Sequence, residues 1–444
     1  MSKLPVVAVI GRPNVGKSSF FNFVTGRRIS IVEDTPGVTR DRIYEKVEWR
    51  GRYFTLIDTG GLEVGSDDPI TVQMRRQAEV AAELADVILF MVDGKQGLTA
   101  GDQEIAALLR RVQKPVLVAV NKVDTVGDVP PEVYEFYNLG SGDLFPVSAA
   151  HGLGIGEILD AIFEVLPEPG EAAEDGDCIS VAIVGKPNAG KSSLVNKILG
   201  EQRVIVSNVP GTTRDAIDTY TEVDGQKYCF IDTAGLRKRG RILDNVEKYS
   251  TMRSLGAVDR SQIVVLMIDA VDGVTEQDTK IAGYALEQGK AMIIAVNKWD
   301  LVEKETNTME KYRQDVLNKF NFIMFAPVVF FSALTGSRVN KLFDTILKVR
   351  EASTRRISTG MLNDCLAEAM ITQQPPSDKG KRLKLYYMTQ IGTEPPTFVI
   401  KCNSKALFHF SYLRYLENQL RKKFDFTGTP IRFKIREKDE ESGD

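Results

Sequence analysis

The sequence is poor in cysteine, in histidine and in long apolar runs. Its 444 residues include four cysteines and two histidines, and no stretch approaches the ~18 apolar residues that a transmembrane helix needs. The cysteines are scattered without a Cys-x-x-Cys pair, which excludes a disulfide scaffold and gives no support for a zinc site. We expect reduced thiols, mostly in cores, in a cytoplasmic protein with no membrane span. The N-terminal apolar run enters a glycine motif directly and predicts a first strand rather than a signal peptide.

The composition is that of a folded protein, with 43% hydrophobic and 26% charged residues. Charge is unevenly spread: residues 351–436 contain 15 Lys/Arg against 7 Asp/Glu, and residues 437–444 carry one lysine and five acids. A basic C-terminal module behind an acidic body suggests a polyanionic partner, with a solvated basic surface as the alternative. We expect the acidic last residues to be disordered and the chain to be a monomer.

An internal repeat organises the first 350 residues. Residues 7–62 align without a gap with residues 181–236, and 26 of these 56 positions are identical. Unrelated sequences would share roughly one position in sixteen, so the segments are copies of one domain. The stretch PEPGEAAEDGD between the copies has no apolar periodicity and predicts a linker. The expected segments are a first domain at 1–166, a linker at 167–177, a second domain at 178–352, a dissimilar domain at 353–436 and a tail at 437–444.

Short apolar runs alternate with amphipathic segments in each copy. The first copy has predicted helices at 17–24, 71–84, 102–112 and 155–166, and predicted strands at 5–10, 53–57, 87–92, 116–120 and 144–147. Apolar strands separated by helices indicate an α/β fold, a mainly parallel sheet with helices on both faces. Ligands of such sheets bind at the carboxyl ends of the strands.

Each copy begins with the motif GxxxxGK[ST] between a predicted strand and a predicted helix. The glycines allow backbone N–H groups to surround phosphates, and the helix N-terminus favours negative charge. Lys17 and Lys191 would contact the β- and γ-phosphates, while Ser18 and Ser192 would bind Mg²⁺. A simple glycine turn is the alternative, which two copies in the same context make remote. The motif residues are Gly11, Arg12, Pro13, Asn14, Val15, Gly16, Lys17 and Ser18, and Gly185, Lys186, Pro187, Asn188, Ala189, Gly190, Lys191 and Ser192.

A DxxG motif follows in each copy, 41 residues after the P-loop lysine. Its carboxylate can hold Mg²⁺ through water, and the N–H of its last glycine can sense a γ-phosphate. Thr39 and Thr213 lie between the two motifs, and their hydroxyls can join Mg²⁺ when a γ-phosphate is present, with turn capping as the alternative. The motif and the residue after it are Asp58, Thr59, Gly60, Gly61 and Leu62, and Asp232, Thr233, Ala234, Gly235 and Leu236.

An NKxD motif follows a later strand of each copy and points to guanine. Its aspartate can accept two hydrogen bonds from guanine N1–H and the exocyclic amine, a donor pair that adenine lacks. The lysine stem can cover the base, and the asparagine can bind N7 or brace the loop. A Ser-Ala pair after the last strand could donate backbone N–H to guanine O6. These residues are Asn121, Lys122, Val123 and Asp124 with Ser148 and Ala149, and Asn297, Lys298, Trp299 and Asp300 with Ser332 and Ala333.

These motifs occur in order, twice, in one chain, which resembles the Der (EngA) family of bacterial tandem GTPases in the Era-like branch. The resemblance covers essentially the whole chain. It implies two P-loop GTPase domains and a C-terminal α+β KH-like domain. It also implies a role in assembly of the large (50S) ribosomal subunit, with that subunit or its rRNA as partner. The spacing itself indicates only guanine-nucleotide binding and hydrolysis.

Hydrolysis must position water without a glutamine after DxxG, because Leu62 and Leu236 stand there. In related Era-like GTPases an asparagine within the P-loop helps to bind K⁺, which can substitute for an arginine finger. We therefore expect slow, K⁺-stimulated turnover with Asn14 or Asn188 contributing; a bracing role in the loop is the alternative. Two other functions compete: a GTPase-gated RNA-modifying enzyme, which would carry one G domain and a C-terminal reactive cysteine, and a non-catalytic nucleotide-gated scaffold.

The two copies differ after DxxG, where only the second has a basic run at 237–241; a solvated loop is the expected role, and contact with RNA or another domain is the alternative. The C-terminal module has predicted helices at 358–371 and 411–424 and strands at 383–391, 397–402 and 431–435. It lacks the GxxG loop with which KH domains bind single-stranded RNA. We expect it to contact phosphates or to dock on the G domains; the phosphate contacts would come from Lys379, Lys381, Arg382, Lys384, Arg421, Lys422 and Lys423. Five of its aromatics are expected in the core, with base stacking as the alternative: Tyr386, Phe398, Phe410, Tyr415 and Phe424.

Overall fold

The computed structural model describes residues 4–26, 44–59, 85–125, 130–140, 143–167, 178–201, 218–233, 247–303, 305–378 and 381–437. The chain divides into two compact units, Met1–Glu174 and Asp175–Asp444. None of the helices in the described ranges is long and apolar enough to cross a membrane.

The first unit is built on a six-stranded sheet in the order β2-β3-β1-β4-β5-β6. All neighbouring strands are parallel except β2 and β3, which form an antiparallel pair. The predicted strands are present, but β2 was not predicted, because its sequence YEKVEW has only two apolar side chains that pack inward. The elements are β1 (Val6–Ile10), α1 (Lys17–Gly26), β2 (Tyr44–Trp49), β3 (Arg52–Asp58), β4 (Val87–Asp93), α3 (Ala100–Leu109), β5 (Val116–Asn121), the 3₁₀ helix η2 (Pro131–Leu139), β6 (Leu144–Pro146) and α4 (Ile155–Val165).

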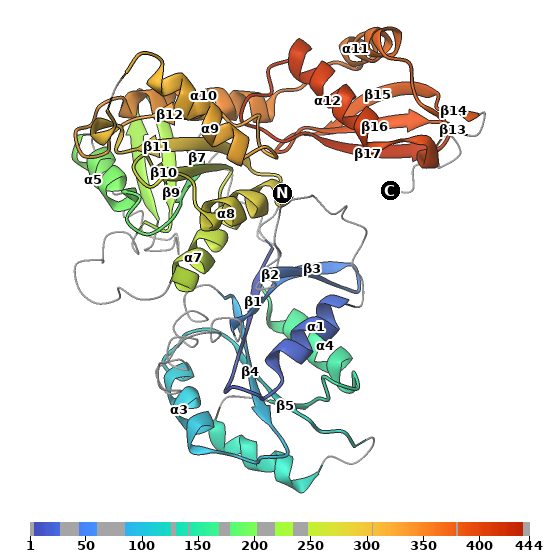
Figure 1. Cartoon of the computed structure of the whole chain (residues 1–444). Helices are drawn as coiled ribbons and strands as arrows, with labels where there is room; N and C mark the ends of the chain where they lie inside the picture. Colours follow the sequence, from blue (N-terminus) through green and yellow to red (C-terminus); the bar gives the residue numbers. More distant parts are fainter. Residues whose placement is uncertain are drawn as a thin grey trace. The chain divides into compact units, whose positions relative to one another are not determined.

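The second unit begins with a sheet of the same design, in the order β12-β11-β10-β7-β9-β8. Helices lie on both of its faces (Figure 1). The predicted α/β class with two copies of a mainly parallel sheet is thus confirmed. The elements are β7 (Cys178–Val184), α5 (Lys191–Glu201), β8 (Thr219–Val223), β9 (Gln226–Ile231), α7 (Glu247–Arg260), β10 (Ile263–Asp269), α8 (Glu276–Glu287), β11 (Ala291–Asn297), η3 (Trp299–Leu301), α9 (Thr308–Lys319), β12 (Val328–Phe330) and α10 (Val339–Thr354).

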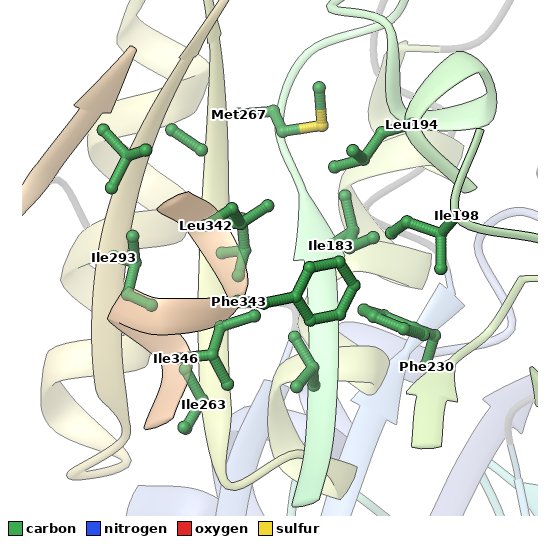
Figure 2. Packing of buried hydrophobic residues seen from close by; sticks show 14 of the residues in the cluster. Ile183, Leu194, Ile198, Phe230, Ile263, Met267, Ile293, Leu342, Phe343 and Ile346 are labelled. Atoms are coloured by element: carbon green, nitrogen blue, oxygen red, sulfur yellow. The ribbon is translucent and has the colours of Figure 1, made fainter. Parts of the chain in front are cut away.

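The central strands of each sheet are continuous apolar runs because both faces are covered. Every residue of β4 and of β10 is buried. Figure 2 shows one face of the second sheet, where Phe343 and Ile346 of α10 reach the strands beside Ile183 of β7. Each large apolar side chain buried in this way contributes about 1.5–3 kcal/mol. This packing fixes the strand ends, where the polar motifs begin.

The C-terminal part is a three-stranded sheet, β15-β16-β17, with α11 and α12 on one face (Figure 1). Strand β16 pairs antiparallel with β15 and parallel with β17. All five predicted elements are present. Strand β17 extends to Glu437, the residue at which the disordered tail was predicted to begin. The elements are α11 (Thr359–Thr372), β13 (Ser377–Asp378), β14 (Lys381–Arg382), β15 (Leu385–Gly392), β16 (Thr397–Cys402), η4 (Lys405–Leu407), α12 (Phe410–Lys423) and β17 (Arg432–Glu437).

Two of the five aromatics expected in this core are exposed. Phe398 and Phe424 are buried and Tyr415 packs against the core, but Tyr386 and Phe410 are 47% and 57% exposed. A register shift between Leu385 and Tyr387 interrupts the alternation of β15, so the simple period-2 prediction fails for Tyr386. Phe410 stands in the first turn of α12, away from the buried stripe of that helix. Of the four free cysteines, three are buried, as predicted.

The C-terminal part docks on the second sheet at the start of β11, the end opposite the motifs. Gly428 accepts a hydrogen bond from Met292 N at 2.6 Å and donates one to Phe325 O at 2.8 Å. The Arg421 guanidinium lies 4.8 Å from the centre of the Phe325 ring and also donates to the carbonyls of Phe426 and Thr429. The expected docking on a G domain is therefore present. Arg421 is part of this joint, so it has the docking role that was one of the two expected for this module, and its contact with phosphate stays a prediction.

Candidate functional site

The P-loop of each copy wraps a buried lysine between the first strand and the first helix. Lys17 Nζ donates to the carbonyls of Gly11 and Arg12 at 2.6 and 2.8 Å, and Lys191 Nζ makes the equivalent bonds at 2.6 Å each. Gly16 and Gly190 have φ of 98° and 96°, a conformation that glycine tolerates best. The lysine is thus held beside the helix N-terminus, where an anion is favoured.

An asparagine joins the P-loop to two other motifs in each copy. Asn121 donates from Nδ2 to Val15 O at 2.7 Å and accepts at Oδ1 from Ala149 N at 2.9 Å. Asn297 makes the same two bonds, to Ala189 O and from Ala333 N, at 2.8 Å each. The bracing role, one of the two that we considered for this asparagine, is therefore observed. Because Ala149 N and Ala333 N already donate to the asparagines, donation to guanine O6 stays a prediction.

The close packing of the asparagine against the P-loop explains why the sixth residue of the motif is glycine. A Cβ at Gly16 or Gly190 would collide with the side-chain amide of the bracing asparagine. Glycine is therefore required here both for its positive φ and for the close approach of the asparagine.

Two candidate Mg²⁺ ligands meet in the first copy. Ser18 Oγ donates to Asp58 Oδ2 at 2.9 Å, so a hydroxyl and a carboxylate lie beside the phosphate loop. In the second copy the strand ends one residue earlier, and Asp232 has φ of 55°, with its N–H bonded to Asp218 Oδ1 at 2.9 Å. Hydroxyl and carboxylate oxygens are ligands that Mg²⁺ accepts.

The NKxD lysine of each copy is held by a buried aspartate that the motif search did not select. Lys122 Nζ lies 2.6 Å from Asp93, and Lys298 Nζ lies 2.6 Å from Asp269. Burial favours a higher pKa for Asp269, but the Lys298 ammonium and the Val271 N–H outweigh it, so this pKa is lowered. The signal was in the sequence: the apolar strands VILFMVD and IVVLMID both end on aspartate.

The candidate base-recognition carboxylates differ in their surroundings. Asp124 accepts from Lys95 Nζ at 2.6 Å and from Ser148 Oγ at 2.7 Å, and the hydrogen bond from Lys95 lowers the pKa of this carboxyl. At the position of Lys95 the second copy has Val271. Asp300 instead lines a pocket with Trp299 and Ser332. Most residues that line this pocket lie outside the sequence motifs, Asn307, Met309 and Arg338 among them.

Several predicted residues lie outside the described part of the chain. These are Thr39, Gly60, Gly61, Leu62, Thr213, Ala234, Gly235 and Leu236, together with Lys379, the helix at 71–84, the basic run at 237–241 and residues 438–444. The remaining predicted residues lie in described segments, in the two P-loops, the first NKxD loop and the first turn of α5. They are Pro13, Asn14, Val123, Pro187, Asn188 and Ser192.

Comparison with known proteins gives two family matches. A family described as "50S ribosome-binding GTPase" matches residues 6–122 and 180–298. A second, described as "KH-domain-like of EngA bacterial GTPase enzymes, C-terminal", matches residues 356–436. The two GTPase matches cover the P-loop and DxxG motifs of each copy and end within NKxD, and the other match coincides with the docked C-terminal part.

Whole-chain relatives give the same answer. Proteins named GTPase Der from Ruminiclostridium cellulolyticum, Acetivibrio thermocellus and Caldicellulosiruptor saccharolyticus are 65%, 62% and 57% identical to this chain. These alignments cover 98–99% of this chain and 99% of each relative. With two P-loop sites and a KH-like domain in the same order, the chain belongs to the Der (EngA) family, GTPases with two G domains.

Proposed function

We propose that each G domain binds a guanine nucleotide at its strand ends and hydrolyses GTP. The observation that carries the proposal is the double brace: in each domain one asparagine ties the phosphate loop to the Ser-Ala loop. Phosphate and base recognition are thereby set at a fixed separation. In each domain the P-loop lysine bonds two carbonyls of the phosphate loop and the NKxD asparagine bonds a third, so residues of two different motifs meet in the same way twice. Single-turnover GTP hydrolysis by chains with one intact site would distinguish an enzyme from a nucleotide-gated scaffold.

Ser18 and Asp58 fit Mg²⁺ in the first domain, since both are hard oxygen donors and lie 2.9 Å apart. When bound, the ion would neutralise charge on the β- and γ-phosphates. Ser192 and Asp232 would serve in the second domain. Lys17 and Lys191 would supply a fixed positive charge to the same oxygens.

K⁺ stimulation belongs to the same proposal. Asn14 and Asn188 are exposed in the P-loops with φ of 65° and 64°, and among the described residues neither side chain has a hydrogen-bond partner. This supports a role toward a ligand over the bracing role. Turnover in matched K⁺ and Na⁺ buffers tests it: Asn14→Ala or Asn188→Ala should abolish the K⁺ advantage at its own site. Equal rates in both ions would remove K⁺ from the mechanism.

We further propose that the protein acts in the cytoplasm in assembly of the large ribosomal subunit. The outer face of the KH-like sheet supports a polyanionic partner. Phe398 and Ile400 of β16 face the helices, so Lys401 points the other way, and it pairs in register with Tyr387 of β15 and Arg436 of β17. Lys434 is exposed on the same face. Of the phosphate contacts predicted from sequence, Lys381, Arg382, Lys384 and Lys422 are exposed, whereas Lys423 is paired with Glu368.

Co-sedimentation with purified large subunits tests this role, with GDP compared with a non-hydrolysable GTP analogue at fixed salt. We expect retention to depend on the nucleotide. Changing Lys401, Lys434 and Arg436 to glutamine should weaken retention and flatten its salt dependence. A matched control changes three exposed lysines of the second G domain, Lys311, Lys319 and Lys341, by the same net charge. Absence of binding in every nucleotide state would refute the ribosomal role and leave the GTPase intact.

A further inference from the structure

The second residue of the P-loop connects to the rest of the domain differently in the two copies. In the first, Arg12 Nε donates to Asp102 Oδ1 at 2.8 Å, and its NH2 group reaches Gln96 Oε1 at 3.3 Å. Asp102 is fully buried and also accepts at Oδ2 from Thr99 N and Oγ1, which caps α3. We call Arg12, Gln96 and Asp102 the P-loop strap, since they tie the phosphate loop to the start of α3.

The second copy has the same cap without the strap. Asp278 is fully buried and accepts at Oδ2 from Thr275 N and Oγ1 at 3.0 and 2.6 Å. Its Oδ1, the counterpart of the atom that receives Arg12, has no hydrogen-bond partner among the described residues. Lys186 stands where Arg12 does, and its ammonium lies 2.5 Å from Asp272, which is 59% exposed.

The difference follows from the chemistry of the two cations. A guanidinium presents several N–H donors in a rigid plane, so Arg12 reaches Asp102 and Gln96 at once. An ammonium is a compact charge without such a planar set of donors, and Lys186 pairs with the exposed carboxylate of Asp272, at the position of Gln96. The second domain therefore retains a buried carboxylate oxygen, Asp278 Oδ1, without a donor among the described residues. Such an acceptor is unfavourable, and a donor that reached it would stabilise the domain.

The strap bears on the phosphate site through the backbone. Arg12 O is one of the two carbonyls that hold Lys17 Nζ, so fixing the Arg12 side chain fixes the peptide that positions the catalytic ammonium. A loop already held in its binding geometry loses less freedom when a phosphate binds.

We propose that Arg12 is a positioning residue of the first nucleotide site. Through Asp102 it rigidifies the first P-loop, so that the first G domain releases nucleotide more slowly than the second. In the second domain Asp278 already occupies the position of Asp102 and could accept a hydrogen bond from an arginine at position 186. The inference rests on guanine-nucleotide binding at both sites, which nucleotide loading measures independently.

The test uses full-length chains in which only one of the two sites binds the fluorescent nucleotide whose release is measured. Asp300→Asn replaces an acceptor by an amide donor that suits the 2-oxo group of xanthine, so a fluorescent GDP analogue then loads only the first site. Asp124→Asn isolates the second site in the same way, with xanthosine diphosphate saturating the altered site. In these backgrounds, Arg12→Lys should speed release from the first site roughly tenfold, the effect of one lost hydrogen bond between charged groups. Lys186→Arg should slow release from the second site by a similar factor.

Two carboxylate variants separate positioning from general packing. Asp102→Asn should reproduce the effect of Arg12→Lys, because the amide presents an N–H to the guanidinium. Asp278→Asn, the matched control, should leave release from the second site unchanged, because no donor is lost. If Arg12→Lys proves too unstable to load, Lys186→Arg still decides, since it adds an interaction. Unchanged release in Lys186→Arg would overturn the proposal, as would a lower thermal midpoint in Arg12→Lys with unaltered release.

Discussion

The two G domains share the contacts within their nucleotide sites but differ in the residues around those sites. The contacts within each site repeat to within about 0.2 Å: lysine to P-loop carbonyl, asparagine to P-loop and to the Ser-Ala loop, and NKxD lysine to strand-end aspartate. The residues just outside these contacts differ. Arg12 is replaced by Lys186, and Lys95 is replaced by Val271.

This comparison separates the contacts that both copies keep from those that differ. The repeated contacts are buried or tied to backbone atoms, so each has one geometry. The divergent residues are side chains at the rim, which change how firmly a loop is held without changing what it can bind. We infer that the two domains bind the same kind of ligand with different kinetics.

The largest effect is expected from the base-recognition carboxylates. Asp124→Asn and Asp300→Asn should each lower GTP affinity at the altered site by about 10³-fold or more, because a guanine donor pair would face an amide. Affinity for xanthosine triphosphate should rise at that site alone. Equilibrium titration with both nucleotides on the full chain measures this. Retained GTP selectivity in either variant would show that another group reads the base.

Much of this site could be predicted from the sequence, for a physical reason. P-loop, DxxG and NKxD residues lie at strand ends, and strand ends follow from apolar runs that can be read directly. Asp93 and Asp102 were missed because each lies outside a short motif, although both repeat in the second copy. Strand β2 was missed because edge strands bury only one face. The exposure of Tyr386 depends on a register shift, which the pattern of one strand does not encode.

The next effect tests the brace that the two domains share. Asn121→Ala and Asn297→Ala each leave a buried carbonyl and a buried N–H without partners, since the two asparagines are 3% and 2% exposed. We expect each variant to lose about 2–4 kcal/mol of stability in its own domain, with loss of nucleotide binding there. Calorimetry with and without GDP measures both. A variant that kept full affinity would separate the brace from the binding site.

A smaller effect is specific to the second domain, where Asp259 lies in the last turn of α7. Burial raises the pKa of Asp259 to about 6, against a lowering influence from the Tyr284 hydroxyl and the Lys290 ammonium. The folded chain therefore holds a proton that the unfolded chain loses. This contribution is complete below about pH 4 and is lost as pH rises through 6. Asp259→Asn should raise stability by about 1–2 kcal/mol at pH 7.5 and by about half as much at pH 5, with no gain near pH 3. Thermal unfolding at both pH values measures it, and a gain that is independent of pH would contradict this assignment.

The smallest effect concerns the rim of the base site. Lys95 bonds Asp124 in the first domain, and both side chains are partly exposed, at 64% and 34%. Because exposed ion pairs are weak, Lys95→Val should change GDP affinity at the first site by less than about fivefold. We expect the change to be an increase, since the carboxylate no longer divides itself between lysine and base, and the salt dependence of binding should diminish. Val271→Lys should have the opposite effect at the second site. If Lys95→Val instead weakened binding, the lysine would be holding Asp124 in its binding orientation, and the rim would contribute to recognition in the first domain alone.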